Sequence, residues 1–435
     1  MIRGLVLFLA LTGSALAQEP PPLKLTLRDA VGLALKQNPQ VILATLNTAQ
    51  AQQDRALARS ELLPQLNGRV QESVNRVNLE AAIGFTFPGF PRHVGPYWVS
   101  QGGVNFNAPL FDLTLWRRYK AARYGIDASR AGEISAREES VLLVVSQYLG
   151  SQRAAADVQA AQSRVDLAQA LYNQAADLQK NGVGTGLDTL RANVTLQNEK
   201  QRLIVSRTQL ETSLFGLSRL LNLDPRQRVE LADSVSFFDT PPVNADQTLE
   251  SAWSTRPEMR QILSEEQRAV LELTAASDQR LPRLSLTGYW AEQGLTPTTA
   301  FPVYQYQWGI DMPLFTGGRI KAERARAEIT IRQLKQQEVD LRNRIALEVK
   351  TSIAELASAR SEVDVANLGV QLARQSVEQS RDRFQAGVTN NVEVIQAQDE
   401  LARANDNQIA ALYRYNQSRA DLAHAAGQME ALYAR

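Results

Sequence analysis

The distribution of proline constrains the fold of this chain more than any other feature of its sequence. No proline lies between Pro109 and Pro225, and none follows Pro313. A proline inside a helix removes a backbone hydrogen bond and clashes with the preceding turn, so these two proline-free stretches can each hold very long helices. A helix over 113–180 would be roughly 100 Å long at a rise of 1.5 Å per residue, which is far more than a small globular domain can use.

Each proline-free stretch contains one strong turn signal, and each signal is centred on a glycine. The sequences NGVGTGLDTLRAN and AGVTNNVEVIQAQ align with Gly182 on Gly387. Glycine just beyond the end of a helix adopts a positive φ at little cost. Asp188 and Glu393 then fall in the first turn of the next helix, where the helix dipole favours an acid. Each stretch is therefore predicted to form an antiparallel helical hairpin. The predicted arms cover 113–180 and 187–222 in the first hairpin, and 318–384 and 391–427 in the second.

Other landmarks recur in the same order, which indicates that the chain contains two copies of one unit. The matched landmarks are Thr26-Leu27 with Thr248-Leu249, Leu63-Pro64 with Leu281-Pro282, and Pro109-Leu110-Phe111 with Pro313-Leu314-Phe315. We therefore expect two tandem repeats with an irregular connection between them, because the intervening segment is rich in proline and polar residues. The predicted divisions are a first repeat at 18–222, a connection at 223–247, a second repeat at 248–428 and a C-terminal tail at 429–435.

The segments before each long helix follow a period of two, which predicts strands. The strands are expected as two hairpins, at 64–77 with 97–110 and at 282–291 with 303–314. In the last strand an apolar and aromatic face alternates with a mostly polar one. The residues of this face, expected to contact lipid, are Tyr304, Tyr306, Trp308, Ile310 and Met312. Such alternation is typical of a membrane β-barrel, although a sheet packed on a soluble core is the alternative. Because lipid does not tolerate open strand edges, a barrel built from four strands per chain would require several chains.

The composition excludes several other classes of protein. The first residues, MIRGLVLFLALTGSALAQ, predict a secretory signal over 1–17, with an uncleaved anchor as the alternative. The chain has no cysteine, which excludes disulfides and thiolate metal sites, and its two histidines are far apart in the sequence. The 47 basic and 46 acidic residues leave no positive excess for binding nucleic acid. No set of nucleophile, base and orienting group is visible, so we expect no enzyme activity, cofactor or metal.

The repeated order of strand hairpin, Pro-Leu-Phe, very long helix and Gly-Val turn resembles the TolC-type outer membrane efflux factors over roughly 24–428. The sequence MPLFTGGRIKAERARAE resembles the strand-to-helix junction of that family, and FQAGVTNNVEVIQAQ resembles its periplasmic turn. The resemblance implies a mainly α fold with a small membrane β portion. It implies a homotrimer that forms a twelve-stranded barrel in the outer membrane of a Gram-negative-type bacterium and an α-helical tunnel in the periplasm, with 223–247 at the equator of the tunnel.

The function implied by the resemblance is passive export of drugs or other small molecules. The solutes would come from an inner-membrane pump of the RND or ABC type, through a periplasmic adaptor protein. The duct of a type I protein secretion system is an alternative within the same class. From other classes, a periplasmic adaptor or a soluble coiled-coil structural protein stays open. An adaptor would normally carry one helical hairpin between β-rich halves, whereas this sequence predicts two hairpins, each preceded by strands.

The resemblance also assigns roles to the two turns. As the periplasmic tip, the turns would contact the adaptor through Gly182, Val183, Gly184, Thr185, Leu187, Gly387, Val388, Thr389 and Val392. The gate and constriction would comprise Asp188, Phe384, Thr389, Glu393 and Gln396. In well-known members a tyrosine and an arginine lock this gate, but Phe384 and Thr389 stand at those positions here, so the lock must use other bonds. A ring of three Glu393 carboxylates would favour cations or protonate in part. A solvated acid at a helix start is the alternative.

Overall fold

The computed structural model describes residues 21–85, 89, 91–233, 243–386, 388 and 391–434. The expected signal at 1–17 lies outside the described residues. The chain divides into two compact units. Unit 1 comprises residues 1–42, 137–249 and 348–435, and unit 2 comprises 43–136 and 250–347. Among the described residues, we find no helix that combines the length and the apolar character needed to cross a membrane.

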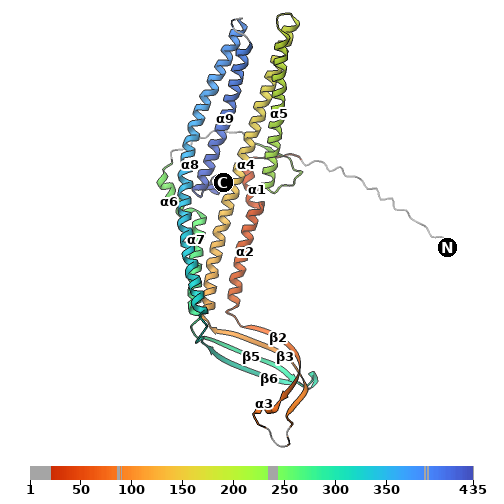
Figure 1. Ribbon diagram of the computed structural model, residues 1–435, viewed down its shortest axis with the longest axis vertical. Helices are drawn as coiled ribbons and strands as arrows, with labels where there is room; N and C mark the ends of the chain where they lie inside the picture. The colour runs from red at the N-terminus through yellow and green to blue at the C-terminus, as the bar shows by residue number, and fades with distance from the viewer. Residues whose placement is uncertain are drawn as a thin grey trace, which may run out of the picture. The chain divides into compact units, whose positions relative to one another are not determined.

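Two very long helical hairpins make up about half of the chain (Figure 1). In the first, α4 (Leu113–Lys180) ends in a turn and α5 (Gly186–Leu220) returns beside it, and in the second, α8 (Arg319–Gln385) is followed by α9 (Asn391–Ala425). The helix α4 has the bounds expected from the sequence, and the ends of the other three arms differ from expectation by at most two residues. Leu341, Ile345 and Val349 of α8 fall at intervals of four residues and are buried, so one face of this helix packs inward.

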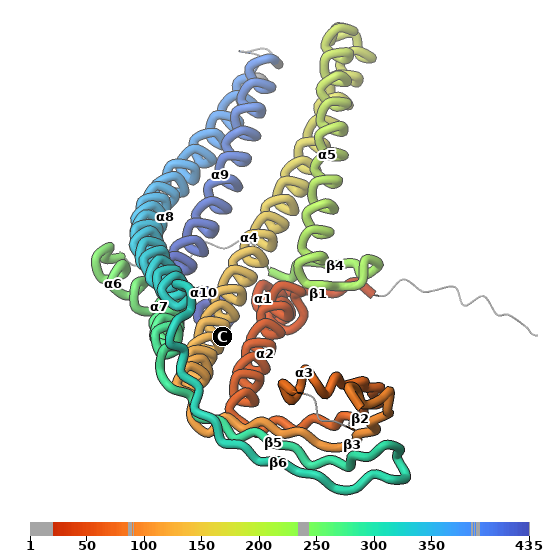
Figure 2. The backbone as a smooth tube through the Cα atoms, turned by 60° about the horizontal axis from the view of Figure 1, so that its bottom comes forward, coloured from red at the N-terminus to blue at the C-terminus, as the bar shows by residue number. Residues whose placement is uncertain are grey.

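The four long strands form one antiparallel sheet in the order β2-β3-β5-β6 (Figure 2). Their bounds are Gln65–Asn78 for β2, His93–Phe111 for β3, Arg283–Gly294 for β5 and Phe301–Asp311 for β6. A short helix, α3 (Leu79–Ile83), lies in the β2–β3 connection, and the 3-10 turn η1 (Pro297–Thr299) lies in the β5–β6 connection. The pairing of β3 with β5 joins the two repeats within one sheet. The last strand ends before the predicted limit of 314, because Pro313 has no N–H to donate to the sheet.

A pair of shorter helices precedes the strands in each repeat, and the sequence reading did not include them. They are α1 (Leu27–Gln37) and α2 (Pro39–Ser60) in the first repeat, and α6 (Ala245–Thr255) and α7 (Pro257–Asp278) in the second. The two pairs have the same lengths, 11 and 22 residues. In unit 2, α2 packs along α4 through a hydrogen bond of 3.2 Å from Thr48 Oγ1 to the carbonyl of Ser129. The duplication therefore extends to elements that the landmarks did not reveal.

The connection at 223–247, which was expected to be irregular, contains ordered structure. Within it β4 (Val229–Leu231) pairs in parallel with β1 (Leu23–Leu25), and α6 begins at Ala245. Val229 is buried in the main core of unit 1, beside Tyr148 and Leu217. Its apolar side chain stabilises a short strand despite the polar composition around it. Residues 234–242 lie outside the described part of the chain.

The described part of the C-terminal tail, residues 429–434, is also ordered. Its first residues form α10 (Met429–Tyr433), and the Met429 side chain is fully buried. The Glu138 carboxylate of α4 accepts hydrogen bonds from the backbone N–H groups of Met429 and Glu430, at 2.8 and 3.3 Å. Arg137 forms an ion pair with the Glu430 carboxylate. Burial of Met429 and this buried acid therefore anchor the end of the chain to unit 1.

Candidate functional site at the hairpin turns

The first turn is closed by its own backbone and by a helix cap. Gly182 has a φ of +77°, as expected for the residue after a helix end. The N–H of Val183 donates to the carbonyl of Leu178 at 2.9 Å. Thr185 caps α5, because its Oγ1 accepts from the Asp188 N–H at 3.3 Å and donates to the Asp188 carboxylate at 2.6 Å. The carboxylate predicted to take part in the gate is therefore bound by the cap of its own helix.

The second turn repeats the backbone of the first in the part that the structure describes. The N–H of Val388 donates to the carbonyl of Arg383 at 3.0 Å, the equivalent of the bond between Val183 and Leu178. Two of the predicted tip residues, Gly387 and Thr389, lie outside the described residues, and so does the side chain of Phe384 in α8. Gln396 is exposed on α9. The predicted lock of this turn therefore stays a prediction.

The apolar residues predicted to meet an adaptor are exposed in both turns. The side chains of Val183 and Val388 are 79% and 70% accessible to solvent. Leu187 and Val392, the second residues of α5 and α9 respectively, are also exposed. Exposed apolar side chains at the end of a long helical hairpin are suited to contact another protein.

Glu393, the predicted constriction residue, forms an ion pair within its own hairpin. The Arg383 guanidinium in the last turn of α8 lies 3.3 Å from the Glu393 carboxylate in the first turn of α9. The sequence reading missed Arg383, because the two charges are separated by a turn and follow no helical spacing. The alignment of the two repeats does single out Arg383, because the equivalent residue in the first hairpin is the uncharged Leu178.

A second ionic cluster in unit 1 connects the two hairpins. The Arg164 guanidinium of α4 donates to both carboxylate oxygens of Asp406 of α9, at 3.0 and 2.9 Å. Its Nε lies 3.7 Å from the buried carboxylate of Glu199 of α5. Burial raises the pKa of the nearby Asp157 above its usual range, and the opposing effect of Arg153 is the next largest influence. The sequence reading did not find this cluster either, because Arg164 and Asp406 are distant in the chain.

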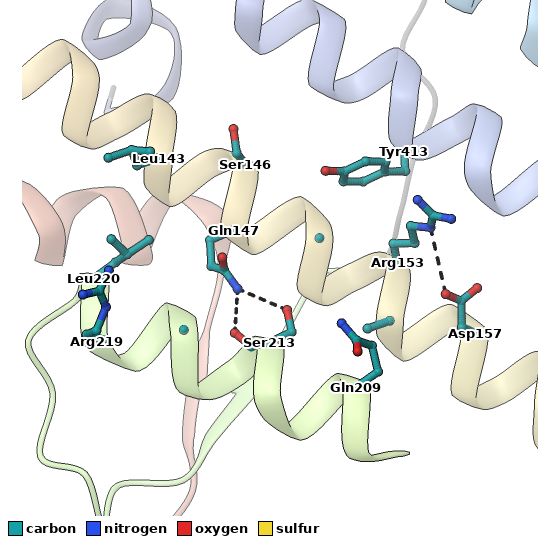
Figure 3. A pocket seen from close by; sticks show the side chains of 13 residues that line it. Leu143, Ser146, Gln147, Arg153, Asp157, Gln209, Ser213, Arg219, Leu220 and Tyr413 are labelled. Carbon is teal, nitrogen blue, oxygen red and sulfur yellow. Dashed lines mark hydrogen bonds and ion pairs between the residues drawn. The ribbon is translucent and has the colours of Figure 1, made fainter. Parts of the chain in front are cut away.

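An open groove of about 720 Å³ lies along α4 and α5, with Tyr413 of α9 on one side (Figure 3). The Gln147 side chain donates to the backbone carbonyl of Ser213 at 2.8 Å. Arg153 forms an ion pair with Asp157 and lies 5.4 Å from the ring centre of Tyr413. Several polar groups of the groove thus bind one another, which suits a structural role. Among the described residues, no cluster of three or more acidic, histidine or cysteine side chains is arranged to hold a metal ion.

The register of the sheet gives it one apolar and one polar face. Directly paired residues of antiparallel strands point to the same face. The row through Tyr306 continues to Gly288, Phe106 and Leu66, and the row through Tyr304 continues to Trp290 and Val104. Two rows of the other face are mainly polar. They are Gln305, Tyr289, Asn105 and Asn67, and then Gln307, Thr287, Asn107 and Gln65. The next row on this face, Val303, Ala291, Gly103 and Arg69, has small or apolar residues except at Arg69.

The predicted lipid-facing residues lie on the apolar face or just beyond it, and all five are exposed. Trp308 and Ile310 are 78% and 76% accessible to solvent in the single chain, and Met312 follows the last residue of β6. Both outer strands, β2 and β6, are paired on one side only within the described chain. The sheet therefore presents an uncovered apolar face and two open edges.

A duplicated unit of strand hairpin and very long helical hairpin, with a sheet that is apolar on one face, defines a class of membrane-associated channel components. A family model for outer membrane efflux proteins matches residues 30–223 and 248–428. The chain therefore belongs to the outer membrane efflux protein family. It is an export channel of the outer membrane with its helical part in the periplasm, and members of this family form trimers that work with adaptor proteins and inner-membrane pumps.

Individual relatives cover most of the chain. The alkaline protease secretion protein AprF of Pseudomonas aeruginosa is 25% identical, over 93% of this chain and 85% of that protein. Among solved structures, the Campylobacter jejuni CmeC outer membrane channel aligns with a TM-score of 0.81 at 19% identity, over 92% of this chain and 85% of that one. The open state of the Neisseria gonorrhoeae MtrE outer membrane channel aligns with a TM-score of 0.76 at 19% identity, over 92% and 88%. These two likenesses show a shared fold.

Proposed function

We propose that three copies of this chain form one duct that crosses the outer membrane and the periplasm. The observation that carries this proposal is the sheet with two open edges and one apolar face. In lipid each unpaired backbone group costs several kcal/mol, so β2 and β6 must find partners. Pairing β6 of one copy with β2 of the next satisfies both edges. Three copies then supply the twelve strands that the family resemblance implies.

The two faces of the sheet support a closed barrel with lipid outside and water inside. The rows through Tyr304 and Tyr306 would face the acyl chains, with aromatic residues near the interface. The glutamine and asparagine rows would line the lumen. Solutes would pass through passively, because the duct itself supplies no energy.

We propose that the periplasmic adaptor binds at the two turns. The exposed side chains of Val183 and Leu187 in the first turn and Val388 and Val392 in the second support this assignment. Gly182, Gly184 and Thr185 hold the first turn in shape for such a contact. The pump behind the adaptor would be of the RND or ABC type.

Two cargo classes fit the duct. The first is drugs or other small molecules, delivered by a tripartite pump. The second is a secreted protein, delivered by a type I system, and the similarity to a protease secretion protein over 93% of the chain favours it. The pump would set the class of exported solute, because the duct only conducts what the pump delivers to it.

The mass of the protein extracted from the outer membrane in detergent tests the assembly. Light scattering should give three chains, and planar bilayers should show discrete conducting channels. A monomer, or recovery in the aqueous fraction, would contradict the shared barrel. Deleting the gene then separates the cargo classes. Raised drug susceptibility with normal protein secretion indicates small molecules, whereas loss of a secreted protein with unchanged susceptibility indicates type I secretion.

A further inference from the structure

The two turns have equivalent backbones but different charges. Aligning Gly182 with Gly387 places Leu178 at the position of Arg383 and Asp188 at the position of Glu393. The backbone bonds that close the two turns fall at the same positions, from Val183 to Leu178 and from Val388 to Arg383. The first turn therefore has an acid with no basic residue at the facing position, whereas the second turn has a basic residue facing its acid.

The hairpin geometry holds the two charges of the second turn together. Arg383 lies in the last turn of α8, where the helix dipole favours a cation, and Glu393 lies in the first turn of α9, where it favours an anion. The turn brings these two helix ends side by side, and the charged groups approach to 3.3 Å. The Glu393 side chain is 35% exposed and that of Arg383 is 57% exposed, so both are in contact with solvent at the tip.

We propose that Arg383 is a specificity-determining residue that neutralises the acidic constriction of the duct. This inference rests on the proposed function and on the constriction that the family resemblance implies, in which the Glu393 carboxylates of three copies meet around one pore. A ring of acids alone selects cations, and a ring of basic residues selects anions. Here each carboxylate has a guanidinium beside it, so the ring has no net charge from these two residues. The mouth then admits anionic and cationic solutes with little preference.

The same structure supplies a matched control. Arg381 lies two residues before Arg383, on a different face of α8, since successive residues are rotated by about 100° around a helix. Among the described residues, no ion pair is seen for Arg381. Replacing either arginine by glutamine removes one positive charge, at positions two residues apart on the same helix, but only R383Q removes the guanidinium beside the Glu393 carboxylate.

The test is the reversal potential of purified trimers in planar bilayers under a KCl gradient. Wild type should select weakly between K⁺ and Cl⁻. R383Q should raise the K⁺ to Cl⁻ permeability ratio severalfold, E393Q should lower it, and R383Q/E393Q should return it close to the wild-type ratio. R381Q should change the ratio much less than R383Q, and R383K should keep the wild-type ratio. Light scattering on each variant confirms that the trimer is intact.

The outcomes separate this inference from the function on which it rests. If the wild-type trimer conducts but is already strongly cation-selective, or if R383Q behaves like R381Q, the role proposed for Arg383 is wrong. The proposed function as an export duct is unaffected by either result. If the wild-type protein neither assembles as a trimer nor conducts, the proposed function fails and the role of Arg383 fails with it.

Discussion

In both helical hairpins a long arm of 68 or 67 residues is followed by a short arm of 35, and the same backbone bond closes each turn. The side chains around that bond differ. The first turn is stabilised from within one helix, because Thr185 binds Asp188 at the start of α5. The second is stabilised between helices, because Arg383 of α8 binds Glu393 of α9. The duplicated backbone therefore tolerates different side-chain chemistry at its tip, where the side chains are exposed to solvent.

The largest difference between the hairpins should appear in their cores. Leu196 and Leu401 occupy equivalent positions, but Leu196 is 2% exposed, whereas Leu401 is only partly buried in the single chain. L196A should destabilise the protein by about 2–5 kcal/mol, through lost burial and a cavity, and L401A by less. The denaturation midpoint of the trimer, followed by circular dichroism, measures both. An L401A effect as large as that of L196A would mean that a neighbouring copy buries Leu401.

The next effect concerns ion pairs between hairpins and within one hairpin. R164Q removes the partner of Asp406 in the other hairpin and leaves the buried Glu199 less well neutralised. Because Arg164 is 20% exposed, we expect a loss of about 1–3 kcal/mol, below the range for fully buried pairs. The control is R414Q, which breaks the pair with Glu362 inside the second hairpin and should cost no more than about 1 kcal/mol. Equal shifts in the denaturation midpoint would show that the ion pair between hairpins stabilises the protein no more than the ion pair within one hairpin.

A substitution at Gly182 tests the backbone conformation of the first turn without adding a side-chain contact. Gly182 has a φ of +77°, and a Cβ added there would meet no atom within 4 Å. G182A should therefore cost about 1–2 kcal/mol through backbone conformation alone. The control is G186A at the start of α5, where the backbone is helical and an added Cβ would meet only the flexible end of Gln179, at 3.3 Å. If Gln179 shifts by a few tenths of an ångström, alanine should be neutral or slightly stabilising there. A G182A protein with the wild-type midpoint would contradict the left-handed conformation of this turn.

The smallest effect should come from Asp157. Burial raises its pKa in the folded state, so the charged form is disfavoured on folding. The penalty is absent below the ordinary pKa of 3.8 and is fully present once the pH exceeds the raised value of the folded state. D157N should therefore slightly raise the denaturation midpoint at pH 7 and have no such benefit at pH 3. A lower midpoint at pH 7 would show that the ion pair with Arg153 outweighs the burial.

The long elements could be predicted from the sequence because each rests on a property repeated over many residues. The absence of proline after Pro109 and after Pro313 fixed the arms of the hairpins, and strict alternation identified β6. The shorter helices were missed for a related reason. Pro39 and Pro257 look like helix breakers, yet each is the first residue of a helix. A backbone N–H at that position has no acceptor within the helix, so proline removes no hydrogen bond there.

The tip was predictable in its backbone and less so in its charges. The glycine signal identified the turn at Gly182, and the spacing of Thr185 and Asp188 could have revealed the helix cap, since a threonine three residues before an acid is a known helix-start pattern. The ion pairs of Arg383 and Arg164 could not be found in this way. The turn brings Glu393 close to Arg383, and the packing of α4 on α9 brings Asp406 close to Arg164. Neither pair has a regular spacing in the sequence from which it could be predicted.

The β3–β5 pairing has a further consequence for symmetry and descent. It joins a strand of the first repeat to a strand of the second, and closing β6 against β2 of the next copy would join the second repeat to the first. The junction inside one polypeptide and the junction between polypeptides are then of the same kind. A ring of three chains would be a pseudo-sixfold ring of alternating halves. This is the arrangement that fusion of two half-length ancestral subunits produces, with one interface in every two made covalently continuous.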